Sequence, residues 1–264
     1  MSRTLADCLN DYRDWGLTDK PSIIRRLPGG LTNHNVLLSC GTQTLLLRLN
    51  NPAASLNLHR PTEQALHQQA AQLGLTPPAL YWAPDHSYLV RPYIPGHSLA
   101  ERRLQASDLP LMAEMLAQVH KMPAPANTPV CDTRAACAHY LAHVSETTAP
   151  QQTLQRKQAL EADLAELPAM PGNHQRVCHL DPLLANWLKA DASLRSQATP
   201  QRLWLLDWEY AALAHPALDY AAVASALPEE LRTTWQSLCP VSDAEFSLAS
   251  RHVALLDACW RLAH

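Results

Sequence analysis

The chain has 264 residues, of which 47% are hydrophobic, and this is enough for one large core or two lobes. Its net charge of -3 supplies no basic field for binding nucleic acid, and no apolar run approaches the length of a membrane span. The N-terminal residues lack the apolar region of a secretory signal, and the seven cysteines form no C-x-x-C pair, so we expect reduced thiols and a cytoplasmic protein.

Short strands joined by turns are predicted for the first third of the chain. Thr4 is suited to cap a helix that runs to about Trp15 and ends at Gly16. A second helix is predicted from Pro61 to Gly74. The predicted strands cover residues 23–27, 35–39, 44–49, 80–82 and 88–93. Short strands separated by tight turns indicate an antiparallel sheet.

Helical spacing of apolar residues replaces the strand pattern after Ile94-Pro95-Gly96. Two short strands interrupt the helices, and we expect them to form a hairpin with a polar tip at 191–201. The predicted helices cover residues 108–122, 133–144, 153–167 and 243–264, with one more opened by 215–219, and the predicted hairpin strands cover 187–189 and 203–206. This order of elements favours an α+β fold, with one part at 1–95 and another at 96–264.

Three polar residues between two apolar segments are the most informative feature of the chain. His179, Asp181 and Asn186 have the spacing H-x-D-x-x-x-x-N. In a phosphotransferase catalytic loop with this spacing, the Asp takes the proton of the substrate hydroxyl and the Asn holds magnesium. A polar loop between two strands would have the same appearance, and the three positions alone do not decide between the two interpretations.

A second aspartate strengthens the catalytic interpretation. Asp207 follows the apolar run Leu203-Trp204-Leu205-Leu206, which reads as a buried strand. A carboxylate at the end of an apolar strand usually has a metal or another cation as its partner. The phosphates of ATP are anionic and require a divalent cation, for which carboxylate and amide oxygens are suitable ligands.

The strings HLDPLLAN and LLDWEYA, together with Gly29-Gly30-Leu31-Thr32-Asn33, resemble those of the choline/ethanolamine kinase and aminoglycoside phosphotransferase superfamily, which includes bacterial thiamine kinases. The resemblance runs from about Ile24 to Tyr220. It implies a protein-kinase-like two-lobe fold, with a nucleotide-binding lobe at 1–95 built on an antiparallel sheet. The remainder, 96–264, would be a larger, mainly helical lobe for catalysis and substrate binding.

The resemblance also implies ATP and Mg2+ as cofactors and a role for each polar residue. Asp181 would accept the hydroxyl proton and His179 would brace its loop. Arg48, on the third strand, would grip the nucleotide phosphates, and Glu63 either orients it or simply suits the helix N-terminus. The remaining implied contacts are those of Asn186 and Asp207 with Mg2+, of Gly29, Gly30, Thr32 and Asn33 with phosphates, and of Asp219 with the catalytic loop.

The expected acceptor is a small cationic alcohol of the choline, ethanolamine or thiamine type. Such a cation needs carboxylates and aromatic faces, for which Glu209, Tyr210 and Trp260 are candidates, although Trp260 is equally suited to core packing. The chain ends at His264, shortly after Trp260, and an incomplete aromatic cage would disfavour choline itself. Two alternatives are an aminoglycoside or amino-sugar phosphotransferase and a non-catalytic nucleotide-binding protein. Neither a nucleic acid nor a membrane is expected as a partner.

Overall fold

The structure is a computed structural model that describes residues 3–28, 33–51, 58–101, 104–145, 147–172, 175–191 and 203–263. Contacts divide the chain into two compact units. The first comprises Met1–Ser98 and Trp187–Glu209, and the second comprises Leu99–Asn186 and Tyr210–His264. The predicted hairpin after Asn186 therefore lies in the first unit, whereas the sequence-based division at 95/96 assigned it to the second part.

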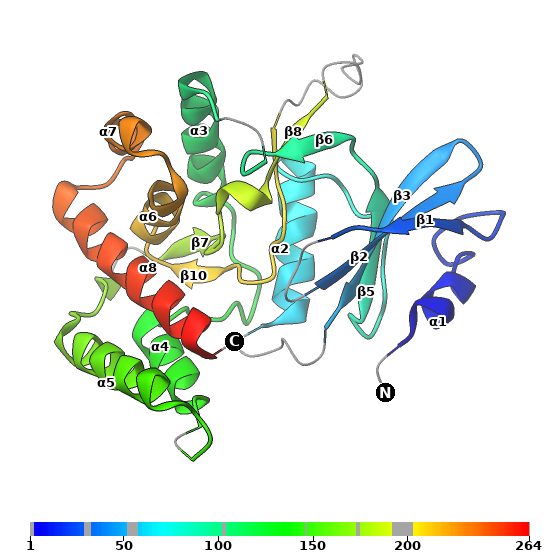
Figure 1. Cartoon of the computed structure of the whole chain (residues 1–264). Helices are drawn as coiled ribbons and strands as arrows, with labels where there is room; N and C mark the ends of the chain where they lie inside the picture. The colour runs from blue at the N-terminus through cyan, green and yellow to red at the C-terminus, as the bar shows by residue number, and fades with distance from the viewer. Residues whose placement is uncertain are drawn as a thin grey trace. The chain divides into compact units, whose positions relative to one another are not determined.

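A five-stranded antiparallel sheet forms the centre of the first unit (Figure 1). Its strands have the order β1-β2-β3-β5-β4, and every neighbouring pair is antiparallel. The strands are β1 (Ser22–Arg26), β2 (Asn33–Cys40), β3 (Gln43–Asn50), β4 (Tyr81–Trp82) and β5 (Tyr88–Pro92). The predicted antiparallel sheet is confirmed. All five residues of the edge strand β1 are exposed, including Ile23 and Ile24.

The two faces of this sheet carry different helices. Side chains alternate between faces along a strand, so Leu45 and Leu47 of β3 lie on the face opposite to Arg48. Leu45 and Leu47 share a hydrophobic cluster with Cys8 and Leu9, which brings α1 (Leu5–Asn10) onto their face. Arg48 instead contacts α2 (Arg60–Gln72). Figure 1 shows α1 and α2 on opposite sides of the sheet.

The first helix is shorter than the sequence predicts. Thr4 caps it as expected, but the helix ends at Asn10 and not near Trp15. The cause is a tertiary contact, because the Trp15 indole is buried and donates a hydrogen bond of 3.1 Å to the Tyr88 hydroxyl. Gly16 closes the segment with a φ of 79°, a conformation that glycine adopts at little cost.

A smaller antiparallel sheet in the first unit has the order β6-β8-β9, with β6 at Gly96–Ser98, β8 at Trp187–Ala190 and β9 at Leu203–Leu205. The β8–β9 hairpin was predicted, but its third strand was not. Ile94-Pro95-Gly96 was interpreted as a break in the pattern, yet Gly96 begins β6. A Cβ at this position would lie 2.4 Å from the Lys189 carbonyl oxygen, so the close approach of the two strands requires glycine.

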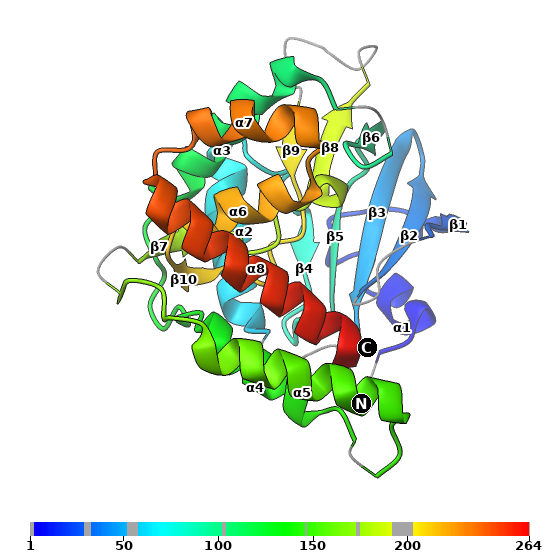
Figure 2. The same cartoon turned by 60° about the vertical axis from the view of Figure 1, so that its left-hand side comes forward.

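The described part of the second unit is mainly helical. Its elements are α3 (Leu109–Val119), α4 (Thr133–Ala142), α5 (Gln151–Glu166), β7 (Arg176–Cys178), β10 (Ala212–Ala214), α6 (Ala217–Ala226), α7 (Glu229–Leu238) and α8 (Asp243–Ala263). Helix α8 packs against α4, α5 and α6 (Figure 2). The helix α7 was not predicted, and neither was the antiparallel pairing of β7 with β10.

An antiparallel sheet followed by a helical remainder confirms the predicted α+β class. All seven cysteines are free thiols in the structure. In the part of the chain that the structure describes, no helix has the length and hydrophobicity needed to cross a membrane.

Candidate active site

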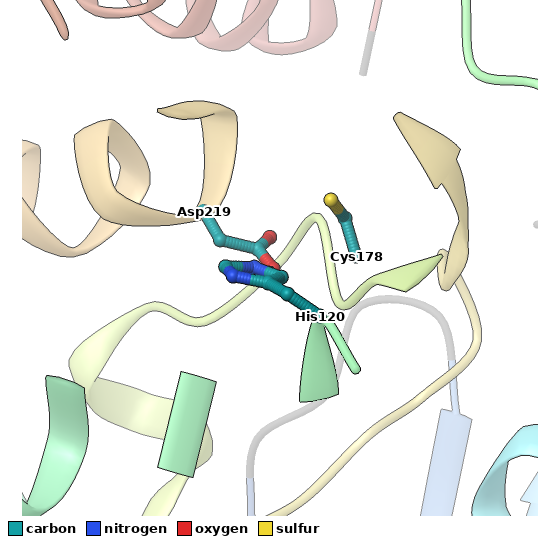
Figure 3. Close-up of side chains that lie close together, drawn as sticks. All are labelled: His120, Cys178 and Asp219. Carbon is teal, nitrogen blue, oxygen red and sulfur yellow. The ribbon is translucent and has the colours of Figure 1, made fainter. Parts of the chain in front are cut away.

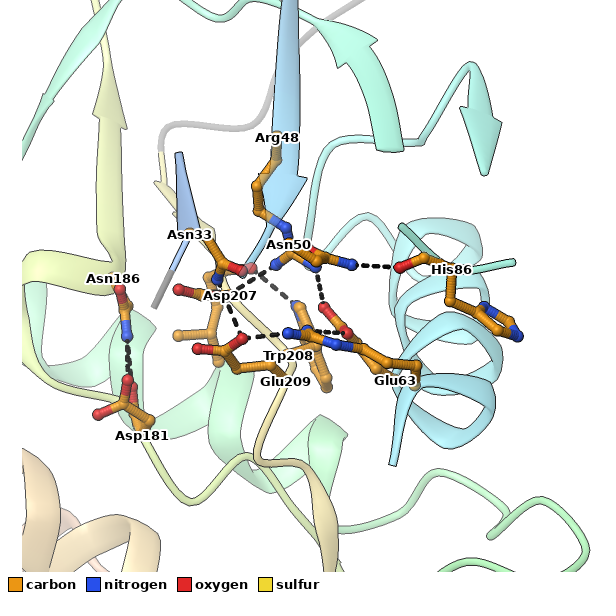
Figure 4. A network of polar contacts seen from close by, with 12 residues as sticks. Asn33, Arg48, Asn50, Glu63, His86, Asp181, Asn186, Asp207, Trp208 and Glu209 are labelled. Carbon is orange, nitrogen blue, oxygen red and sulfur yellow. Dashed lines mark hydrogen bonds and ion pairs between the residues drawn. The ribbon is translucent and has the colours of Figure 1, made fainter. Parts of the chain in front are cut away.

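The catalytic motif forms a compact turn in the second unit. Strand β7 delivers His179, and a 3-10 turn at Leu184–Asn186 follows. The side-chain amide of Asn186 donates to the Asp181 backbone oxygen at 2.8 Å and to its carboxylate Oδ2 at 2.7 Å (Figure 4). His179 is fully buried, and its Nδ1 accepts the Asp181 backbone N–H at 3.3 Å. The structure therefore brings the three predicted residues together, with Asp181 held from both sides.

A buried carboxylate restrains the backbone of this turn through hydrogen bonds. Leu180 has a φ of 66°, a left-handed conformation that a non-glycine residue adopts only where the surroundings fix it. Asp219 supplies that restraint: its Oδ2 accepts the His179 N–H at 2.9 Å, and its Oδ1 accepts the Leu180 N–H at 2.7 Å. The implied contact of Asp219 with the catalytic loop is present.

Asp219 belongs to a buried cluster with His120 and Cys178, whose side chains converge in Figure 3. Their possible ligand atoms lie within 4.8 Å of one another, a spacing that suits a metal ion. However, the Asp219 oxygens already contact two backbone N–H groups and His120 Nε2, the last at 2.9 Å. Burial and the nearby Asp219 raise the pKa of the Cys178 thiol well above its ordinary value, which disfavours the thiolate that a metal requires. The cluster is better suited to bracing the turn.

A network of two arginines and three carboxylates occupies the first unit (Figure 4). Arg48 lies between Glu63, with which it forms the predicted ion pair, and Asp207, whose Oδ1 is 2.8 Å from Arg48 Nη1. Arg60 adds a second cation, with Nη1 at 2.7 Å from Glu63 and 3.0 Å from Glu209. Every polar atom of this network comes from β3, from α2 or from the segment that follows β9.

Asp207 differs from Glu63 in how the network balances its charge. Two guanidinium groups pair with the three carboxylates, and a third, that of Arg91, interacts electrostatically with Asp207. Burial raises the pKa of Asp207 to about 6, against the opposing effect of Arg48. Burial also acts to raise the pKa of Glu63, but Arg48 and Arg60 outweigh it and lower that pKa. The protein thus balances the charge of Asp207 less completely than that of Glu63, and the Asp207 side chain remains 30% exposed. This fits a site for a divalent cation.

The remaining predicted site residues have varied surroundings. Gly29, Gly30 and Thr32 lie outside the described residues. Asn33 is buried, and its amide donates to Glu209 Oε2 at 3.0 Å, so both side chains have internal partners. Trp260 packs against a hydrophobic cluster of α4, α5 and α8. This contact corresponds to the alternative in which Trp260 is a core residue. The roles of these residues, and that of the partly buried Tyr210, in binding a ligand stay predictions.

Arg60 and His120 are polar residues that the sequence interpretation missed. The i,i+3 spacing of Arg60 and Glu63 at a helix start would have suggested an ion pair between them. His120 follows the last turn of an apolar helix, and no spacing in the sequence indicates its contact with Asp219.

A carboxylate fixed within a turn and a cation paired with a glutamate are recurring parts of phosphoryl-transfer sites. The sequence profile of the phosphotransferase enzyme family matches residues 23–238. The chain belongs to this family, which confirms the resemblance found in the sequence and the predicted enzyme class, a phosphotransferase. A search of curated proteins found no match.

Solved structures of related proteins share the fold. A choline/ethanolamine kinase family protein from Mesorhizobium loti is 25% identical, with a TM-score of 0.61 over 94% of this chain and 79% of that chain. A choline kinase from Streptococcus pneumoniae is 18% identical, with a TM-score of 0.69 over 98% and 91%. A spectinomycin phosphotransferase, solved with ADP and spectinomycin, is 10% identical, with a TM-score of 0.69 over 98% and 87%. These similarities confirm the predicted protein-kinase-like fold.

The Arg48–Glu63 pair provides a first testable prediction. Arg48→Ala should raise the KM for ATP and lower the rate, and Glu63→Ala should cause part of the same loss, because Glu63 orients the guanidinium. Groups in direct contact couple, so the effects of the two changes on kcat/KM should deviate from additivity by about 0.5–3 kcal/mol. Steady-state kinetics of both single variants and the double variant measure this deviation from additivity. Strictly additive effects would contradict a functional pair.

Proposed function

We propose that the protein transfers the γ-phosphoryl group of ATP to the hydroxyl of a small cationic alcohol. The observation that carries this proposal is the geometry of Asp181, whose carboxylate is bonded by Asn186 and whose backbone rests on His179. A carboxylate fixed in this way accepts a proton from a neighbouring hydroxyl without first having to reorganise. Membership of the phosphotransferase enzyme family supports the same reaction.

In the proposed reaction, the acceptor oxygen attacks the γ-phosphorus while its proton passes to a carboxylate oxygen of Asp181. The bond between the γ-phosphorus and the bridging oxygen breaks, and ADP leaves with that electron pair. Arg48 contacts the nucleotide phosphates and keeps its charge, because Glu63 and Asp207 raise its pKa by more than burial lowers it. Asn186 and Asp207 would hold Mg2+, which supplies positive charge to the phosphates.

Related proteins of known structure bear on the acceptor class. The relative with 25% identity belongs to the choline/ethanolamine kinase family, which favours a cationic alcohol. The spectinomycin phosphotransferase has a similar fold and keeps the aminoglycoside or amino-sugar alternative open. Glu209 was predicted to face the acceptor cation, but in the structure it contacts Arg60 and Asn33. Tyr210 and Trp260 are the other residues proposed for the acceptor.

A phosphate-transfer screen tests both the reaction and the acceptor class. Purified protein with ATP and Mg2+ is offered choline, ethanolamine, thiamine, aminoglycosides and simple sugars, and ADP release is measured for each. We expect turnover with at least one cationic alcohol. Turnover on an aminoglycoside or sugar alone would overturn the acceptor assignment. Nucleotide binding without turnover on any alcohol would favour the non-catalytic alternative.

Trp260 provides a prediction that separates packing from acceptor binding. Its contact with the α4, α5 and α8 cluster predicts that Trp260→Ala lowers the free energy of unfolding by about 2 kcal/mol, less than the 3–5 of a fully buried aromatic. A buried cation–π contact of about 2 kcal/mol would in addition raise the KM of the acceptor roughly thirtyfold. Denaturation measures the first effect and kinetics the second. An unchanged acceptor KM would leave Trp260 a packing residue only.

A further inference from the structure

Arg60 is a partly buried cation that the catalytic roles above do not use. It is the first residue of α2, and its side chain is 15% exposed. A single nitrogen, Nη1, contacts Glu63 Oε2 at 2.7 Å and Glu209 Oε2 at 3.0 Å. The two carboxylates are almost fully buried, at 1% and 2% exposure of their side chains. One guanidinium therefore joins two acids that are 146 positions apart in the chain.

The position of Arg60 is unfavourable for the helix itself. A cation at a helix N-terminus opposes the macrodipole, at a typical cost of about 0.3–1 kcal/mol. His59 already caps α2 through its ring nitrogen, and Pro61 suits the first turn, so helix formation does not require an arginine. The contacts of Arg60 with Glu63 and Glu209 are the features that account for a cation at this position.

Each of the two acids is linked to a residue of the proposed metal and phosphate site. Glu63 orients Arg48, and Glu209 lies two residues after Asp207. Glu209 also accepts the amide of Asn33, the first residue of β2, which follows the predicted phosphate loop. Arg60 consequently connects helix α2, the segment that carries Asp207 and the start of β2 through two hydrogen-bonded carboxylates.

We infer that Arg60 is a positioning residue that fixes the Asp207 segment to helix α2 and so sets the affinity of the site for Mg2+ and nucleotide. The inference rests on the proposed function, in which Asp207 holds the metal. Arg60 touches neither metal nor nucleotide in this role, and it acts through Glu63 and Glu209. Residues that do not bind a metal themselves but orient its ligands typically contribute about 10–100-fold to metal affinity or activity.

The experiment compares Arg60→Gln, Arg60→Lys, Glu209→Gln and the double variant Arg60→Gln/Glu209→Gln with the unchanged protein. We expect Arg60→Gln to raise the Mg2+ concentration needed for half-maximal nucleotide binding by about 10–100-fold and to leave the acceptor KM unchanged. Arg60→Lys keeps the charge and should restore part of the affinity. The double variant removes both charges of one pair, so its loss should be smaller than the product of the single losses.

A nucleotide-free measurement tests the connection separately from catalysis. Hydrogen–deuterium exchange of the backbone at 203–210 should increase in Arg60→Gln, while exchange in α4 of the other unit stays unchanged. Arg261→Gln is the matched control, because Arg261 also pairs with a carboxylate, Asp257, but the two side chains are 72% and 52% exposed. The control should match the unchanged protein in every assay.

The outcomes separate the inference from the proposed function. Normal Mg2+ dependence and normal exchange at 203–210 in Arg60→Gln would overturn the inference. A lower melting temperature with an unchanged Mg2+ requirement would do the same, since it would reduce Arg60 to a stabilising residue. Increased exchange in the variant, together with no phosphate transfer by the unchanged protein, would support the connection and reject the proposed function. If Arg60→Gln does not fold, Arg60→Lys provides the same measurements.

Discussion

Asp181→Asn should lower kcat by roughly 10²–10⁴-fold and leave ATP binding intact, because it removes a proton acceptor without changing the shape of the side chain. The Asn186 amide would still find an oxygen at position 181, so the turn should keep its geometry. Steady-state kinetics measure the loss of turnover, and calorimetric titration with a non-hydrolysable ATP analogue measures binding.

A matched control for Asp181→Asn is Asp163→Asn, which makes the same change at an exposed position on α5. It should leave turnover and binding unchanged. Full activity of Asp181→Asn would place the catalytic base elsewhere in the chain. A parallel loss of ATP affinity would show that Asp181 acts in nucleotide binding and not in proton transfer alone.

Asp207→Asn should abolish most Mg2+-dependent nucleotide binding, because it removes an anionic oxygen ligand of the kind that Mg2+ requires. The backbone explains the choice of asparagine. Asp207 has a φ of 63°, and aspartate and asparagine adopt this left-handed conformation more readily than other non-glycine residues. Asp207→Ala should show the same loss together with added backbone strain.

The pH dependence of Mg2+ binding provides an independent check on Asp207. Its pKa is raised to about 6, so the carboxylate is ionised at neutral pH and takes up a proton as the pH falls through 6. A metal must compete with that proton, and the affinity for Mg2+ should therefore decrease between pH 7 and pH 5. Asp207→Asn should lose this pH dependence. Retention of Mg2+-dependent binding in the variant would exclude Asp207 as a ligand.

The regular elements could be predicted where the sequence pattern and the tertiary contacts agree. The strands that became β2 and β3 are short apolar runs next to turns, and the structure has strands over the predicted ranges. The first helix was predicted too long because the burial of Trp15 against Tyr88 outweighs the local preference. Gly96 was interpreted as a break because the partner that requires it, Lys189, lies far away in the sequence.

The site could be predicted in its motif residues but not in its connections. The spacing of Asp181 and Asn186 is local, so the hydrogen bond between them followed from the motif. The contact of His120 with Asp219 spans 99 positions and has no local signal. The contacts of Glu209 also have no local signal. Glu209 was assigned to the substrate because it is an acid beside the motif, whereas its partners Arg60 and Asn33 are distant in sequence.

The edge strand β1 has a consequence for handling the protein. Its five residues are exposed, and among the described strands it has a neighbour on one side only, so its outer backbone groups are open to another strand. Ile23 and Ile24 would add apolar contact to such a pairing. Arg25 and Arg26 oppose it, because two copies that meet at this edge bring four positive charges together. Concentrated salt screens that repulsion, and dilute buffer preserves it.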